Sequence, residues 1–392
     1  MPGRLKLGLN VFDMALKRMV EEYDAGHRII VAVSGGKDSG ACLELAVMAA
    51  TMAGRLPVEA VTRDEEIAWP GTYEYLERMH ERDDVDLTWL VANQPITNAF
   101  DRADPYWWVF DPLVDPELWV RQPPPYAVFA PELDIQDMVN LRRYPVADGQ
   151  ELRAVVGLRV SESSGRLMGL HSQGGYITAV TREGCRNITP IYDWKDGDIW
   201  LAHKKFGWDY SSAYDVMNRY DIKMRDLRIG PPTMNGAGGE ALRLFGQYAW
   251  PDWWNRVCRR LPSIRTFAKY GKVAIEPQRR LGESWEECFQ RECIDTAPDW
   301  IAARSEAVRN KVVGMHLRHA AGKPLPQVSG CHGCGLMASW RDLVKTMYLG
   351  DPFSKSCGLP CVEPEFFRPG AGFYDKKPTF GPEWQTRQQV NA

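Results

Sequence analysis

Six consecutive residues near the start of the chain offer the groups that a bound phosphate needs. The hexad reads Ser-Gly-Gly-Lys-Asp-Ser and consists of Ser34, Gly35, Gly36, Lys37, Asp38 and Ser39. Its glycines allow bare backbone N–H groups to approach an anion closely, and its serines add hydroxyl donors. Lys37 adds a positive charge, while Asp38 can orient these groups or help to hold Mg²⁺. The hexad therefore predicts a turn that binds phosphate.

The residues on either side of the hexad predict the elements that position it. Residues 29–33 are apolar and mostly β-branched, which is typical of a short buried strand. Good helix formers follow the hexad until Gly54 and Pro57, which end a helix. This order places free N–H groups at a helix N-terminus, where the helix dipole favours an anion. The hexad matches neither the Walker phosphate loop nor the dinucleotide-binding glycine pattern.

Three further segments predict strands of the same sheet. They cover residues 56–62, 86–91 and 151–159, with a helix capped by Thr72 between the first two. This alternation predicts an α/β fold with a parallel twisted sheet and helices on both faces. Ligands of such sheets bind beyond the carboxyl ends of the strands, and Asp64 falls at one of these ends.

A second candidate for anion binding follows the strand at 151–159. Gly157 and Arg159 lie where this strand ends, so a guanidinium reaches the ligand edge and can fork onto phosphate oxygens. Arg166 can act as a second clamp. A surface ion pair is the plain alternative for an arginine in this position.

These motifs resemble those of a known superfamily. The hexad resembles the PP-loop of the adenine nucleotide α-hydrolase superfamily, and Gly157-Leu158-Arg159 with Glu162-Ser163 resembles an element of its phosphoadenosine phosphosulfate (PAPS) reductase-like branch. Residues 64–72 also resemble a sub-branch described as prophage co-activators, related to phage PAPS reductase-like proteins. The resemblance implies a HUP-like α/β domain that binds ATP or a phosphosulfate nucleotide.

The resemblance also implies roles for single residues. Lys37, Asp38 and Arg159 are the expected catalytic groups, and Mg²⁺ is the expected metal partner of the nucleotide. The implied nucleotide-binding residues are Ser34, Gly35, Gly36, Lys37, Asp38, Ser39, Asp64, Gly157, Arg159, Glu162 and Arg166.

The chain lacks one motif of the assimilatory reductases, the Glu-Cys-Gly-x-His nucleophile. Cys185 is the nearest lone thiol, and an inert buried cysteine is its plain alternative. We therefore interpret the chain as a PP-loop enzyme that adenylates an acceptor and releases pyrophosphate. We expect it to serve sulfur transfer, with nitrogen as the alternative transferred atom. The alternatives are a true PAPS reductase or sulfotransferase-type enzyme, and a non-catalytic nucleotide-sensing or DNA-binding module.

A cysteine cluster near the end of the chain predicts a metal site. Its four members are Cys331, Cys334, Cys357 and Cys361. Four thiolates from two short loops suit a closed tetrahedral Zn²⁺ site and also suit a [4Fe–4S] cluster. Free thiols are the third possibility, because nine cysteines in all argue against a disulfide framework.

Charge is concentrated in one segment. The whole chain of 392 residues has a net charge of −3, whereas residues 253–280 hold eight basic residues and one acidic residue. Trp253, Trp254, Phe267 and Tyr270 are interleaved with these charges, as in surfaces that bind DNA or tRNA. A solvated helix face above core aromatics is the alternative.

Length and composition predict a multidomain globular protein. We expect a nucleotide-binding domain at 1–225 with a lid-like insertion at 95–150, a mainly helical basic region at 226–320, and a Cys-rich metal-binding region at 321–392. No apolar run has spanning length and the N-terminus lacks a signal-like segment, so we expect a cytoplasmic protein without a membrane partner. A partner protein and a homo-oligomer both remain open.

Overall fold

The chain forms two compact units, which are described separately. The first contains the described residues up to 92 and from 119 to 230, and the second contains those from 95 to 118 and from 232 onward. The computed structural model describes residues 8–92, 95–98, 101–103, 105–130, 138–162, 164–173, 175–181, 184–230, 232, 241–270, 277–320, 322–328 and 339–352. The division at 225 and 320 stays a prediction of domain organisation.

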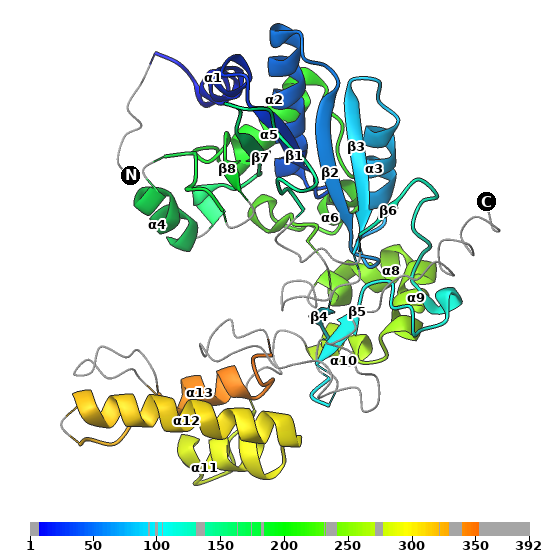
Figure 1. The fold of residues 1–392 in the computed structure, drawn as a ribbon. Coiled ribbons are helices and arrows are strands. Elements are labelled where there is room, and N and C mark those ends of the chain that lie inside the picture. Colours follow the sequence, from blue (N-terminus) through cyan, green and yellow to red (C-terminus); the bar gives the residue numbers. More distant parts are fainter. Residues whose placement is uncertain are drawn as a thin grey trace. The chain divides into compact units, whose positions relative to one another are not determined.

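A six-stranded parallel sheet forms the centre of the first unit (Figure 1). Its strand order is β6-β3-β2-β1-β7-β8, and every neighbouring pair is parallel. The strands are β1 (Arg28–Ala32), β2 (Val58–Asp64), β3 (Val85–Val91), β6 (Val128–Phe129), β7 (Leu152–Val155) and β8 (Cys185–Ile188). The predicted parallel α/β sheet is confirmed, and it fits a HUP-like arrangement of strands with flanking helices. The sequence missed β6, because two residues are too short for a periodic signal.

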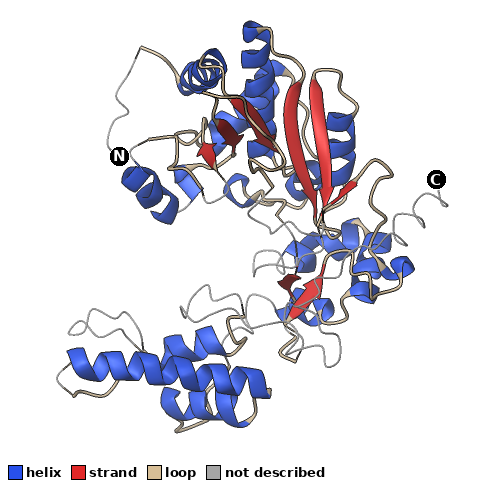
Figure 2. Ribbon diagram, viewed as in Figure 1, coloured by secondary structure: helices blue, strands red, loops and turns tan. Residues whose placement is uncertain are grey.

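In the described part of this unit, six α-helices accompany the sheet. Figure 2 shows them in blue beside the red strands. They are α1 (Val11–Asp24), α2 (Lys37–Ala53), α3 (Thr72–His80), α4 (Ser164–Gln173), α5 (Asp196–Phe206) and α6 (Ala213–Arg219). Helix α2 ends at Gly54 in the left-handed conformation with φ of 65°, as the sequence predicts. Helix α3 begins at Thr72, and Gly71 occupies the cap position expected for that threonine.

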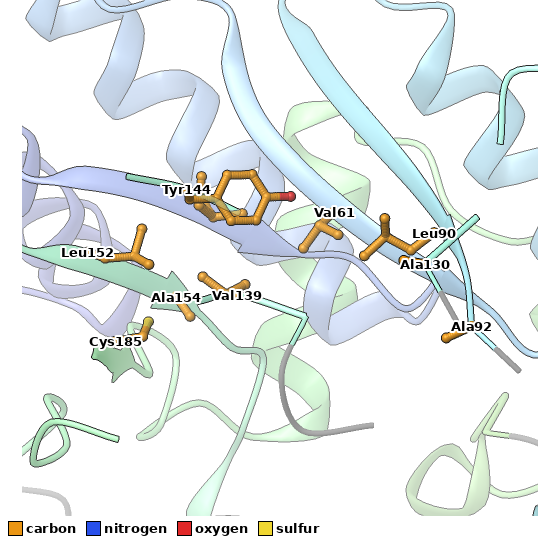
Figure 3. Packing of buried hydrophobic residues seen from close by; sticks show 10 residues of the cluster. Val61, Leu90, Ala92, Ala130, Val139, Tyr144, Leu152, Ala154 and Cys185 are labelled. Carbon is orange, nitrogen blue, oxygen red and sulfur yellow. The ribbon is translucent and has the colours of Figure 1, made fainter. Parts of the chain in front are cut away.

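The two faces of the sheet are covered differently. On one face Arg153 of β7 binds Glu22 of α1, and Trp89 of β3 stacks on Tyr73 of α3. On the opposite face an apolar cluster joins strand residues to Val139 and Tyr144 of the irregular segment after β6 (Figure 3). This covering segment is irregular, whereas the sequence predicts helices on both faces of the sheet.

Strand β1 lies at the point where the strand order reverses. Its neighbours are β2, which follows it through α2, and β7, which comes much later in the chain. In open α/β sheets, ligands bind outside the carboxyl ends of the strands at such a switch point. The hexad and the end of β7 therefore meet where a ligand of this fold is expected.

The second unit is mainly helical in its described part. A short antiparallel hairpin of β4 (Pro95–Thr97) and β5 (Tyr106–Trp108) accompanies α8 (Gln247–Ala249), α9 (Pro251–Arg260), α10 (Ile264–Tyr270), α11 (Trp285–Gln290), α12 (Asp299–His319) and α13 (Trp340–Met347). Phe289, Val308 and Val344 are among the residues that bring α11, α12 and α13 into one apolar core. Within the described ranges, every helix is too short or too polar to cross a membrane.

Candidate functional site

The hexad forms a turn that leaves backbone donors free. Gly35 has a φ of 76°, and a Cβ on this residue would lie 2.5 Å from Cγ2 of Thr72, so both its conformation and its space demand glycine. Gly36 caps α2 without a side-chain hydrogen bond. Among the described residues, no hydrogen-bond acceptor faces the backbone N–H groups of Gly35, Gly36 and Asp38. Three donors at one helix N-terminus are thus available to an external anion.

The two serines of the hexad hold the turn closed. The Ser39 hydroxyl donates to the Gly36 carbonyl at 3.0 Å and accepts from the Ser34 backbone N–H at 3.1 Å. The two hydroxyl oxygens lie 3.1 Å apart. Ser39 is buried, whereas Ser34 is exposed. Ser39 therefore fixes the shape of the turn, and Ser34 keeps access to a ligand.

Lys37 is buried beside the turn with its charge partly satisfied. Its ammonium donates to Oδ2 of Asp38 and to the carbonyl of Leu227, both at 3.1 Å, and the residue is 4% exposed. An ammonium has three donors, so one remains after these two bonds. The side chain is thereby held at the N-terminus of α2, next to the free amides.

Asp38 and Arg159 form the centre of a buried ion network. Nε of Arg159 lies 2.5 Å from Oδ1 of Asp38, and a terminal nitrogen lies 2.8 Å from Asp196 and 3.6 Å from Glu162. The Arg159 side chain is 1% exposed. Since Lys37 holds the other oxygen of Asp38, this carboxylate orients two cations. The geometry thus favours the orienting role of Asp38 over that of a metal ligand.

Gly157 brings the end of β7 directly onto α2. A Cβ on Gly157 would lie 2.8 Å from the carbonyl carbon of Asp38 and 2.8 Å from the nitrogen of Ser39. Both contacts are to backbone, which cannot move aside as a side chain can. The glycine predicted from sequence is therefore required by close packing of two chain segments at the switch point.

Two arginines extend the positive charge of the site. Arg166 of α4 pairs with Glu162, and burial together with the charge of Arg228 lowers the pKa of its guanidinium. Arg228 is exposed and has no ion pair among the described residues. Arg228 adjoins Leu227, whose carbonyl accepts a hydrogen bond from the ammonium of Lys37. The sequence did not identify Arg228, because the loop that carries it has no motif.

Asp64 lies at the end of β2 with its carboxylate occupied. It accepts from the indole N–H of Trp89 and from the backbone N–H of Glu66, both at 2.9 Å, and pairs with Arg121. The sequence did not single out Arg121. Beside Gly35, the buried hydroxyl of Thr72 has no hydrogen-bond partner in the described part of the chain. A direct contact of Asp64 with a nucleotide stays a prediction.

Cys185 is remote from the ligand edge. It is 2% exposed and opens β8, where it pairs with Leu152 at the start of β7 (Figure 3). The carboxyl ends of these strands lie three residues further on, about 10 Å away. This position favours the inert buried thiol over the nucleophile.

The remaining predicted residues lie elsewhere. Cys331, Cys334, Cys357 and Cys361 fall outside the described residues, so the cysteine site stays a prediction. In the parts of the chain that are described, no group of three or more His, Cys, Asp or Glu side chains is placed to hold a metal. Residues 253–270 of the basic segment lie on α9 and α10 of the second unit and on the turn between them.

The basic segment is divided by burial. Arg256, Arg259 and Arg265 are exposed, whereas Arg260 donates to the carbonyl of Trp108 at 2.5 Å. The guanidinium of Arg260 also lies 5.4 Å from the centre of the Trp107 ring. Arg260 therefore packs inside the second unit. Arg256 and Arg259 are exposed to a partner surface, whereas Arg265 forms a hydrogen bond with Cys258.

The fold and the turn define a class: an open parallel α/β sheet with a glycine-rich turn at its switch point. No protein-family model matches the sequence. The chain is similar to the uncharacterized protein YbdN of Escherichia coli (strain K12), with 25% identity over 382 residues, which cover 89% of this chain and 90% of that protein.

Solved structures show a weaker likeness. FMN adenylyltransferase of Candida glabrata, in complex with FAD and inorganic pyrophosphate, is 12% identical with a TM-score of 0.34, over 53% of this chain and 60% of that chain. PAPS reductase from Candida auris, in a phosphate complex, is 13% identical with a TM-score of 0.30, over 58% of this chain and 98% of that chain. The strand order, rather than these scores, assigns the fold.

Proposed function

We propose that the chain is a PP-loop enzyme of the PAPS reductase-like kind, which binds ATP with its phosphates in the turn 34–39. The observation that carries this proposal is the set of three free amides at the N-terminus of α2, beside a buried lysine and at the switch point of the sheet. The Lys37 ammonium keeps one N–H donor beyond its bonds to Asp38 and Leu227, and that donor is available to a ligand. A polyphosphate fits these donors better than any neutral ligand.

The proposed reaction is adenylation of an acceptor. An oxygen of the acceptor attacks the α-phosphorus, the bond to the bridging oxygen of the β-phosphate breaks, and pyrophosphate leaves with the electron pair. The free amides and Lys37 stabilise the charge on the phosphate oxygens, and Arg159 fixes Asp38 and, through it, Lys37. A sulfur nucleophile then displaces AMP from the acceptor.

Magnesium enters this proposal as part of the nucleotide. Both oxygens of Asp38 already face cations, so Asp38 does not offer the metal a free carboxylate oxygen. Mg²⁺ is commonly held by substrate phosphates and water with few protein ligands. The substrate is therefore written as magnesium–ATP, and no step depends on a metal bound by the protein.

The test is release of AMP and pyrophosphate from α-labelled ATP with oxygen-bearing acceptors and a sulfide or persulfide donor. We expect release by the native protein and by Lys17→Met, whose lysine is an exposed surface residue of α1. We expect none by Lys37→Met. Binding of ATP without release under any acceptor would reject the enzyme and favour the nucleotide-sensing module.

A true PAPS reductase is less well supported, because its chemistry requires an accessible thiolate at the ligand edge. Cys185 is buried and lies at the other end of its strand. Sulfite release from PAPS that needs thioredoxin and is lost in Cys185→Ser would nevertheless reinstate this alternative.

The four-cysteine site at 331–361 remains part of the proposal. Zinc there would close a structural loop, whereas a [4Fe–4S] cluster would supply electrons or sulfur. Elemental analysis of the purified chain distinguishes the two, and loss of the metal in Cys334→Ser would link it to this cluster.

A further inference from the structure

Tyr214 reaches the phosphate turn from a distant part of the chain. Its phenol oxygen accepts the backbone N–H of Lys37 at 3.0 Å, and a Cβ on Gly36 would lie 3.7 Å from the same oxygen. The residue lies on α6 and is 3% exposed. The hydroxyl is therefore positioned at the first turn of α2, among the free amides.

The O–H group of Tyr214 donates no hydrogen bond within the described part of the chain. The ring is fixed by the edge of Trp200 at 5.2 Å, and the Lys37 ammonium lies 5.6 Å from its centre. Burial raises the pKa of the phenol well above its ordinary value, so the proton is retained at neutral pH.

A buried O–H without an acceptor costs free energy unless a ligand completes it. Tyr75 has a similar buried hydroxyl, but it faces Gly40, one turn further along α2. The Tyr214 hydroxyl, in contrast, contacts Lys37, the residue that opens the helix. Because its oxygen accepts from an amide, its own proton becomes a stronger donor.

We propose that Tyr214 is a ligand of the nucleotide's phosphate, donating its phenol proton to a phosphate oxygen while its oxygen holds the Lys37 amide. This inference rests on the proposed binding of a nucleotide at the turn. The Tyr214 hydroxyl adds a neutral hydrogen-bond donor to the free backbone amides of the turn. It thus favours a phosphate-bearing ligand without adding charge.

The experiment measures affinity by calorimetry for magnesium–ATP, pyrophosphate and adenosine with three forms of the full chain. Tyr214→Phe removes the hydroxyl, and Tyr75→Phe is the matched control. We expect Tyr214→Phe to lower the affinity for ATP and pyrophosphate by about 10-fold or more, since the lost bond is to a charged acceptor. Adenosine affinity should be unchanged, and Tyr75→Phe should bind all three like the native chain.

The outcomes separate the two proposals. If the native chain binds no nucleotide, the proposed function fails. If the native chain binds ATP and Tyr214→Phe binds it equally well, only the tyrosine inference fails. A loss that affects adenosine as much as ATP would also overturn it, because a purely structural tyrosine acts on both.

A second variant tests the inference in case Tyr214→Phe does not fold. A ring-fluorinated tyrosine at 214 keeps the shape but gives up its proton at lower pH. We expect its ATP affinity to fall as the pH rises through that titration while adenosine affinity stays constant. Equal pH profiles for both ligands would contradict the inference.

Discussion

At the scale of single residues, the site depends on how one carboxylate is shared. Asp38 lies between Lys37 and Arg159. The Arg159 side chain has almost no exposure and pairs with three carboxylates. Removing one member of a buried network costs more than its pairwise attraction, because the remaining charges are left uncompensated. The shape of the phosphate turn is therefore coupled to the stability of the unit.

This coupling predicts the effect of Arg159→Ala. It leaves the carboxylates of Asp38 and Asp196 without their shared cation, so we expect a loss of about 3 kcal/mol in the free energy of unfolding. Arg78→Ala is the matched control, since its pair with Asp209 is exposed and is worth less than about 1 kcal/mol. Urea denaturation of both variants measures the difference. Equal losses would show that the network adds nothing.

A second residue-scale prediction concerns Gly157. An added methyl group meets backbone of α2 at 2.8 Å, so Gly157→Ala should cost about 2 kcal/mol and weaken nucleotide binding. Gly169→Ala in α4 meets nothing within 4 Å and should be neutral or stabilising by up to about 1 kcal/mol. Denaturation and nucleotide titration test both. A Gly157→Ala protein as stable as the native one would refute the close contact.

At the scale of elements, sequence periodicity was enough to predict the long helices and strands that bury one face. Strands β1 to β3 were found within about two residues, and α2 ends at the predicted glycine. Short elements were missed: strand β6 has only two residues, which give no periodic pattern. The hexad was found because its motif is local.

The contacts around the hexad could not be found in the same way. Arg121 reaches Asp64 and the phenol of Tyr214 reaches Lys37 by long-range packing, which leaves no pattern in neighbouring residues. His203 is a further case, donating through Nε2 to the Lys37 carbonyl at 3.0 Å from helix α5. Sequence thus located the phosphate turn, and tertiary structure identified what supports it.

The basic helices α9 and α10 permit a prediction at this scale. Arg259 is exposed, so Arg259→Gln should weaken binding of DNA or tRNA and reduce its salt dependence by about one ion. Arg260 is engaged with Trp108, so Arg260→Gln should act through stability instead. Filter binding across a salt series, with thermal unfolding in parallel, checks both. Unchanged affinity of Arg259→Gln would remove this segment as a nucleic-acid surface.

At the scale of the whole molecule, the account depends on one placement. The strand order puts the turn 34–39 at the switch point, and Gly157 brings β7 against it. Everything proposed about catalysis requires that a nucleotide occupies this turn. The acceptor, the sulfur donor and the cysteine site can all change without affecting that claim.

Calorimetric titration of the full chain with magnesium–ATP tests this claim most directly. We predict saturable binding at one site, lowered at least about 10-fold by Lys37→Met and unchanged by Lys17→Met, because the first removes a buried charge beside the turn and the second a solvated one. No heat of binding at saturating nucleotide, or equal affinity in Lys37→Met, would contradict the account.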